Sequence, residues 1–276
     1  MISRKPKPST QKISPNKCLT NKDPCTWCNL ATSEERERIF NNQKYYDDVH
    51  PLDYTFTFEE GLANVLTHAI CIIPAIVAWY RIQSVADDPR EYLVCFLYGT
   101  GLIALFLTST VYHFVFFLEQ THSCRTLSHK LRPIRRFLSL LDRAVIFIFI
   151  AGSYTPWLVL KDTGWIGPFI CKAIWVTALF GWVYHRTPLH TMYPKLEALI
   201  YAIVAVIPGM VVIYTVKDVN GLILLLTGFL SYIVGLVFYL NDGIRYNHAA
   251  WHLFVNSGAF CHYLSLYNEK FVNNWK

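Results

Sequence analysis

The chain has 276 residues, of which 53% are hydrophobic and only 16% are charged, and its formal net charge is +6. Soluble domains carry about 25% charged residues, so this composition argues against a soluble globular protein. The basic residues concentrate in a polar N-terminal segment and in a few short loops. This distribution favours attraction to lipid headgroups over nucleic-acid binding.

The first segment, residues 1–58, is polar and begins rich in Lys, Pro, Asn and Ser. This composition predicts a mostly disordered tail, with one short helix over "TSEERERIF" (32–40). Cys25 and Cys28 form a "CTWC", which is a weak zinc signal without a second pair nearby. The first apolar block starts near residue 62, too far along for a cleavable signal peptide, so we expect it to insert uncleaved.

Seven apolar blocks follow the tail, and each is close to the roughly 20 residues that a helix needs to cross the hydrocarbon core. Six contain no Asp, Glu, Lys or Arg, and the block 164–184 contains only Lys172. The six are residues 62–80, 92–118, 144–160, 198–216, 221–240 and 246–267. The sequence therefore predicts an all-α polytopic membrane protein, a seven-transmembrane helix bundle over 59–270, with a short C-terminal tail over 271–276.

Basic residues in the loops predict the orientation. With the N-terminus in the cytosol, the inside loops are 118–139, 185–195 and 241–247, and they hold eight Lys or Arg. The outside loops then hold four. This bias predicts a cytosolic N-terminus.

Polar groups inside a membrane are costly, so each is a candidate functional residue. The predicted topology places eight of them in one layer, near the cytosolic ends of four helices. They are Glu60, Asn64, His68, Ser109, His113, Asp142, His248 and His252. His262 lies about 15 Å further along its helix than His252, at 1.5 Å per residue.

The histidine spacing suggests a metal site. His248 and His252 are four residues apart and share one helix face, a geometry that closes on one metal ion. His113, one turn beyond Ser109, is the candidate third ligand. Three histidines and one open position are typical of a catalytic zinc site, where bound water reaches a pKa of about 7. Asp142 is the candidate group to orient that water or accept its proton.

Simpler roles remain open for these residues. A single histidine in a membrane helix is more often a packing or hydrogen-bonding residue than a ligand, and we expect this for His262. His68 is expected to pack, or to brace the metal ligands, with Glu60 and Asn64 as further supporting residues. Asp142 has the alternative of an ion pair with Arg143.

Four segments carry a family resemblance, and they span most of residues 50–270. They are "EGLANVLTH" (60–68), "STVYH" (109–113), "LDRAVIFIFIAGSYTPWL" (141–158) and "DGIRYNHAAWHLFV" (242–255). In this order they resemble the motifs of the progestin and adipoQ receptor family, which is related to the hemolysin III proteins. The details are most similar to its monocyte to macrophage differentiation factor branch.

The resemblance implies a seven-helix receptor-type protein with a cytosolic N-terminus and zinc bound near the cytosolic face. The implied zinc ligands are His113, His248 and His252, with Asp142 and Ser109 beside the site. Alkaline ceramidases in the wider superfamily imply hydrolysis of a ceramide amide. The branch implies a Golgi, endolysosomal or plasma-membrane location. A cytosolic signalling partner for the tail is a further expectation.

Three hypotheses follow from these patterns. The first is a zinc-dependent amidohydrolase that acts on a ceramide-type membrane lipid, alongside or within a receptor role. The second is a signalling scaffold in which zinc is structural. The third is a hemolysin III-like pore, which the gathering of polar residues at one depth disfavours.

Overall fold

The computed structural model describes residues 56–121, 125–184, 187, 194–215, 219–241 and 243–273. These residues form seven helices and contain no strand. The helices are α3 (Phe58–Ser84), α4 (Pro89–Thr121), α5 (Arg125–Leu160), α6 (Ile166–Tyr184), α8 (Pro194–Thr215), α9 (Val219–Tyr239) and α10 (Asn247–Asn273). The predictions for residues 1–55, including the "CTWC" and the short helix, lie outside the described residues.

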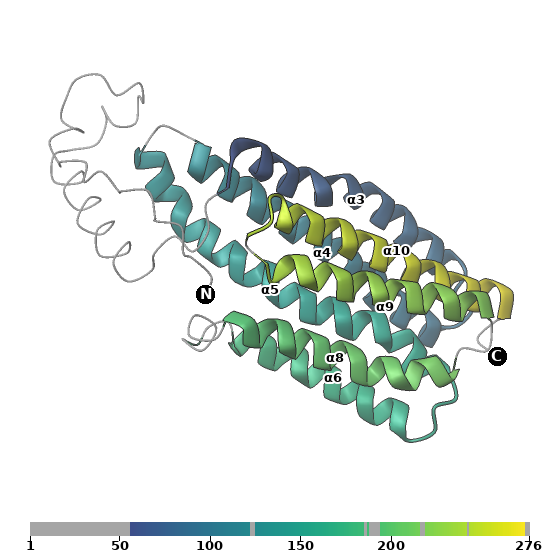
Figure 1. Ribbon diagram of the computed structural model, residues 1–276. Coiled ribbons are helices and arrows are strands. Elements are labelled where there is room, and N and C mark those ends of the chain that lie inside the picture. Colours follow the sequence, from purple (N-terminus) through teal and green to yellow (C-terminus); the bar gives the residue numbers. More distant parts are fainter. Residues whose placement is uncertain are drawn as a thin grey trace, which may run out of the picture.

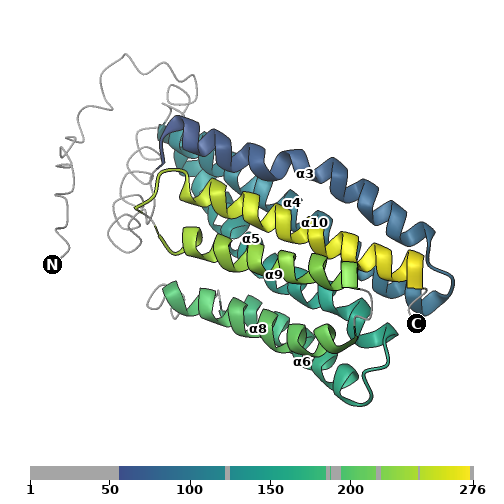
Figure 2. The ribbon, with the colours of Figure 1, turned by 45° about the vertical axis from the view of Figure 1, so that its right-hand side comes forward.

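The helices run alongside one another, joined by short connections at alternate ends (Figures 1 and 2). α3 packs against α4 and α10, α4 against α5, and α9 against α10. α6 and α8 lie along one side of the other five in both views, where they contact α5. The all-helical bundle predicted from the sequence is confirmed.

Membrane insertion is supported by the helices' length and surface. Within the described ranges, five helices are long and apolar enough to cross a membrane: α3, α4, Lys130–Leu160 of α5, α6 and α9. α8 has a shorter apolar stretch, Ala198–Tyr214, and α10 is more polar because it carries the histidine cluster. Large apolar side chains are exposed on the outside, such as Ile73 and Leu179, as expected for surfaces that face lipid.

The expected inside loop over residues 118–139 is largely helical in the structure. α4 and α5 continue as helices through most of this region, because charge removes a helix from the hydrocarbon without ending it. Buried Glu119 on α4 pairs with Arg132 at 3.4 Å and also with Arg135, both on α5. These ion pairs hold the two helical extensions together.

A second ionic cluster lies at the opposite end of the bundle. Lys270 Nζ on α10 lies 2.7 Å from both Asp87 Oδ2 and Glu91 Oε2 at the start of α4. Glu269 pairs with Lys161 just after α5. All but Asp87 are buried. These ion pairs therefore join the C-terminal end of α10 to the connection between α3 and α4 and to the residue that follows α5.

Candidate metal centre

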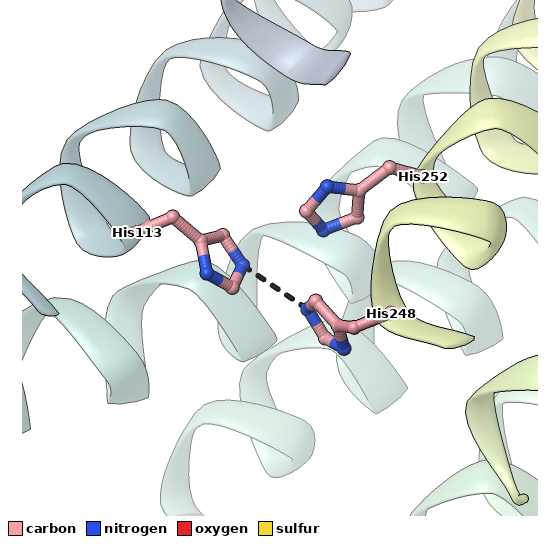
Figure 3. Close-up of side chains that lie close together, drawn as sticks. All are labelled: His113, His248 and His252. Atoms are coloured by element: carbon pink, nitrogen blue, oxygen red, sulfur yellow. Dashed lines mark hydrogen bonds between the residues drawn. The ribbon is translucent and has the colours of Figure 1, made fainter. Parts of the chain in front are cut away.

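Three histidines meet between α4 and α10. His113 comes from α4, and His248 and His252 from the first two turns of α10 (Figure 3). One ring nitrogen of each lies within 4.8 Å of the others, and the Nε2 atoms of His113 and His248 are 3.0 Å apart. His113 and His252 are buried and His248 is half-buried.

This spacing fits a divalent metal ion. Zinc–nitrogen bonds of about 2.0–2.1 Å in a tetrahedral site put ligand nitrogens about 3.3 Å apart, and the observed separations bracket that value. An all-imidazole set suits zinc, copper, iron or nickel. The predicted trio thus does come together, and it could hold a metal ion.

A hydrogen bond to Thr67 on α3 bears on which ring nitrogen of His252 carries the proton. Its hydroxyl lies 2.9 Å from the Ala63 carbonyl, to which it donates its single hydrogen. The arrangement that uses both contacts has the Thr67 oxygen accepting from His252 Nδ1, also 2.9 Å away. His252 then carries its proton on Nδ1 and presents an unprotonated Nε2, as metal-binding histidines require. Asn256 Nδ2, one turn along α10, donates to the Thr67 carbonyl at 2.8 Å.

Two predicted supporting residues lie in the same layer. The ring of His68 stacks on His252 with centroids 3.8 Å apart and planes inclined by 21°. Both ring nitrogens of His68 and Oδ1 of Asn64 are buried without a hydrogen-bond partner among the described residues. Buried polar groups are normally satisfied, so these three atoms are an exception within the layer of the triad.

Glu60 supports the site through hydrogen bonds to two backbone amides. Its carboxylate accepts from the Thr57 amide at 2.8 Å and its own amide donates to the Thr57 hydroxyl at 3.3 Å, which forms a capping box at the start of α3. Its other oxygen accepts from the Tyr246 amide at 3.1 Å. Tyr246 immediately precedes α10 and has a φ of 58°. Glu60 therefore joins the first turn of α3 to the segment that presents His248.

The remaining two predicted residues share a cavity with the histidines. Ser109 is buried one turn before His113, and Asp142 is half-buried on α5. Both line a cavity of about 370 Å³ whose wall also includes His248 and His252. The structure thus gathers every predicted site residue except Glu60 and Asn64 at this cavity or in the triad beside it.

The cavity extends from the triad between α3, α4, α5, α8, α9 and α10, and most of its wall is apolar. Four of its lining residues are also exposed on the outside of the bundle: Val206 and Met210 on α8, and Leu226 and Ile233 on α9. These four residues place the α8–α9 side of the cavity wall at the outer surface of the bundle.

Sequence reasoning missed Thr67 and Asn256 as parts of the site. The signals were present, because Thr67 directly precedes His68 and Asn256 lies one helical turn after His252. Their roles depend on how α3 packs against α10, which spacing within one helix does not reveal.

Fold and site together define an integral multi-pass membrane protein, a helical bundle with a three-histidine cluster at one end of a largely apolar cavity. A family model described as "Haemolysin-III related" matches residues 56–263. The chain belongs to this haemolysin-III related family, and the match contains the triad and the whole cavity wall.

Named relatives agree with this assignment. The chain is 37% identical over 215 residues to the human "Monocyte to macrophage differentiation factor", covering 78% of this chain and 86% of that protein. It is 29% identical over 210 residues to "Hemolysin-3" of Bacillus cereus, covering 73% and 87%. A "Hemolysin-3 homolog" of Bacillus subtilis is 29% identical over 213 residues. The family resemblance predicted from the four motifs is confirmed.

Proposed function

We propose that this chain is a receptor-type membrane protein that binds zinc through His113, His248 and His252 and hydrolyses the amide bond of a ceramide-type lipid. The observation that carries the proposal is the position of the triad at one end of an apolar cavity whose α8–α9 side lies at the outer surface of the bundle. Such a cavity accepts acyl chains, while the polar layer receives the group to be cleaved.

The chain's own residues supply binding and proton transfer. Bound zinc would supply an activated water at neutral pH. Asp142 accepts a proton from the attacking water and returns it to the leaving amine. The Ser109 hydroxyl donates a hydrogen bond to the amide oxygen as negative charge develops there. The apolar wall holds the chains and keeps bulk water from the reacting group.

The first experiment measures zinc content and hydrolysis together. Full-length protein purified in detergent is expected to carry about one zinc per chain and to release sphingoid base from ceramide. Asp142→Asn should keep the metal and lose the activity. Asp162→Asn is the matched control, because Asp162 is exposed in the turn after α5. A wild type that holds zinc but releases no product would refute hydrolysis.

A second candidate is a signalling scaffold in which zinc is structural. It is favoured by the positions of the ligands, because α4 and α10 are far apart in the sequence and a bound ion would join them. Metal removal should then unfold or greatly destabilise the protein without any lipid product having been formed. A pore remains the third proposal, suggested by the names of the bacterial relatives, and planar-bilayer conductance would support it.

Location and partners are proposals of the same kind. We propose a Golgi, endolysosomal or plasma-membrane location and a cytosolic partner that binds residues 1–58. Both follow from the family resemblance and the predicted orientation. Tagging each terminus and testing its protease protection in intact vesicles would measure that orientation.

A further inference from the structure

The cavity wall carries one guanidinium that the proposed hydrolysis does not use. Arg143 on α5 lines the cavity and directly follows Asp142. Histidines aside, these two are the only described residues of the wall whose side chains are charged at neutral pH. A charged side chain within a membrane helix is costly, so it is a candidate functional residue. Arg143 therefore calls for a role of its own.

The position of Arg143 along α5 directs it to the cavity. Side chains three or four residues apart lie on the same face of a helix. The wall residues of α5 follow this spacing, and they include Arg143, Ile146, Ile150 and Ser153. Arg143 thus belongs to the face of α5 that lines the cavity, and it is half-buried there.

Arg143 acts at the end of the cavity that holds the triad. Side chains on a helix lean toward its N-terminus, which for Arg143 leads away from the apolar middle of the cavity. Its charge acts on His248 of α10 and on Tyr112 of α4, and both of these residues line the cavity too. The guanidinium is therefore within electrostatic reach of both helices that supply the metal ligands.

The backbone that carries Arg143 is anchored to a neighbouring helix. The hydroxyl of Tyr201 on α8 donates to the Arg143 carbonyl at 3.0 Å, and Tyr201 also lines the cavity. This bond joins α5 to α8 at the level of the site. A fixed backbone limits the positions that the guanidinium can reach, as a group that recognises a ligand requires.

We propose that Arg143 binds the phosphate of a phosphorylated lipid head, so that the lipid of this cavity is an N-acyl sphingoid with a phosphate beside its amide. A guanidinium presents its donors in a fork that matches two phosphate oxygens. In such a lipid the phosphate is attached to the carbon next to the one that carries the amide nitrogen. Adjacent residues, whose Cα atoms are about 3.8 Å apart, would then serve the amide and the phosphate. The inference rests on the proposed function, since it specifies the lipid class of the same cavity.

The charge at this end favours an anion over a neutral head. Asp142 offsets Arg143, and a zinc ion held by three neutral histidines would add two positive charges. A plain ceramide brings only hydroxyls and an amide, whereas a phosphate brings a compensating charge. The carboxylate of the released acid has similar chemistry, but it forms at the metal position itself, which leaves the neighbouring Arg143 for the phosphate.

The test compares a ceramide with the same ceramide phosphorylated on its terminal hydroxyl. Binding to the full-length, detergent-purified protein is measured by displacement of a fluorescent ceramide, over a time too short for turnover. The wild type is expected to prefer the phosphorylated lipid by about tenfold, near the lower end of what a hydrogen bond to a charged group contributes.

Substitutions locate that preference. Arg143→Gln should reduce it to within about twofold while the affinity for plain ceramide changes little, because only the charged bond is lost. Arg143→Lys keeps the charge without the fork and should retain about threefold. Arg245→Gln is the matched control, because Arg245 is exposed just before α10 and does not line the cavity, and it should keep the full preference.

The outcomes separate the two proposals. Equal wild-type affinity for the two lipids, or a preference that survives Arg143→Gln, would overturn the phosphate site and leave lipid binding intact. Failure of both lipids to bind would overturn the lipid cavity itself, and with it the proposed function. Loss of the preference when inorganic phosphate is added in excess would show a site for free phosphate and overturn the lipid assignment. Loss in Arg143→Gln alone, with the control unchanged, would support the proposal.

Discussion

Thr67 offers a direct test of the metal centre, because it touches no metal position and acts only through His252. Thr67→Val keeps the shape of the side chain and removes its oxygen. His252 Nδ1–H would lose its acceptor at 2.9 Å, and the loss of a buried hydrogen-bond partner costs about 1–3 kcal/mol. Moving the proton to Nε2 avoids that cost but blocks the nitrogen that faces the metal position.

Both the lost hydrogen bond and the shift of the proton to Nε2 weaken metal binding. Loss of a partner that orients a metal-binding histidine typically lowers affinity by about 10–100-fold. We expect a loss in this range for Thr67→Val, measured as zinc affinity by competition with a chromophoric chelator. Thr67→Ser, which retains the hydroxyl, should recover affinity to within about threefold of wild type. Methyl loss in that variant is a small packing change.

The control separates an effect on His252 from a general helix effect. Thr108 on α4 donates to the Ala104 carbonyl at 2.8 Å, as Thr67 does to Ala63, but among the described residues no hydrogen bond joins it to a histidine. Thr108→Val should leave zinc affinity unchanged. Thr67→Val with wild-type zinc affinity would refute the assigned proton position, whatever its effect on melting temperature.

Three further predictions concern the frame of the site. His252→Ala should reduce the metal content of purified protein from about one ion per chain to near zero, measured by mass spectrometry of the ions. Glu60→Ala should destabilise the protein by about 1–2 kcal/mol, because it removes the acceptor of the Thr57 amide in the capping box and the acceptor of the Tyr246 amide. Thermal unfolding in detergent measures this. Lys270→Met should cost about 3–5 kcal/mol, because it leaves buried Glu91 uncompensated, and a similar melting temperature in that variant would contradict it.

The sequence predicted the bundle well because lipid imposes a length and an apolar composition on each helix. It predicted the triad because His248 and His252 are four residues apart on α10 and His113 lies at the same depth on α4. It did not predict that residues 118–139 are largely helical, because a count of charges does not locate a helix end. The ion pairs of Glu119 with α5 that stabilise that extension join residues more than ten positions apart.

The cavity was beyond sequence reasoning for a related reason. Its wall combines side chains of six helices, and α8 and α9 contribute residues that no local pattern marks as functional. His262 illustrates the difficulty. It was expected to be a hydrogen-bonding residue, and its bond to Leu225 confirms this, yet its place at the far end of the cavity follows only from how α9 packs on α10.

The restraints on α10 bear on whether zinc serves chemistry or structure. Its first turn is held through Tyr246 and Glu60, its middle by Ser231 donating to the Phe254 carbonyl at 2.9 Å, and its last turns by the Lys270 cluster. A metal ion that joins α10 to α4 therefore adds to a helix that is already fixed at three levels. Small zinc domains differ, because their folding depends on the ion.

Removal of the metal should accordingly leave the bundle folded. After chelation and removal of the chelator, we expect unchanged helical circular dichroism and a melting temperature lowered by only a few degrees. Hydrolysis of ceramide should disappear in the same sample and return when zinc is added back. A chelated protein that loses its helical signal or aggregates would instead favour the scaffold, since the three restraints on α10 would then be insufficient without the ion.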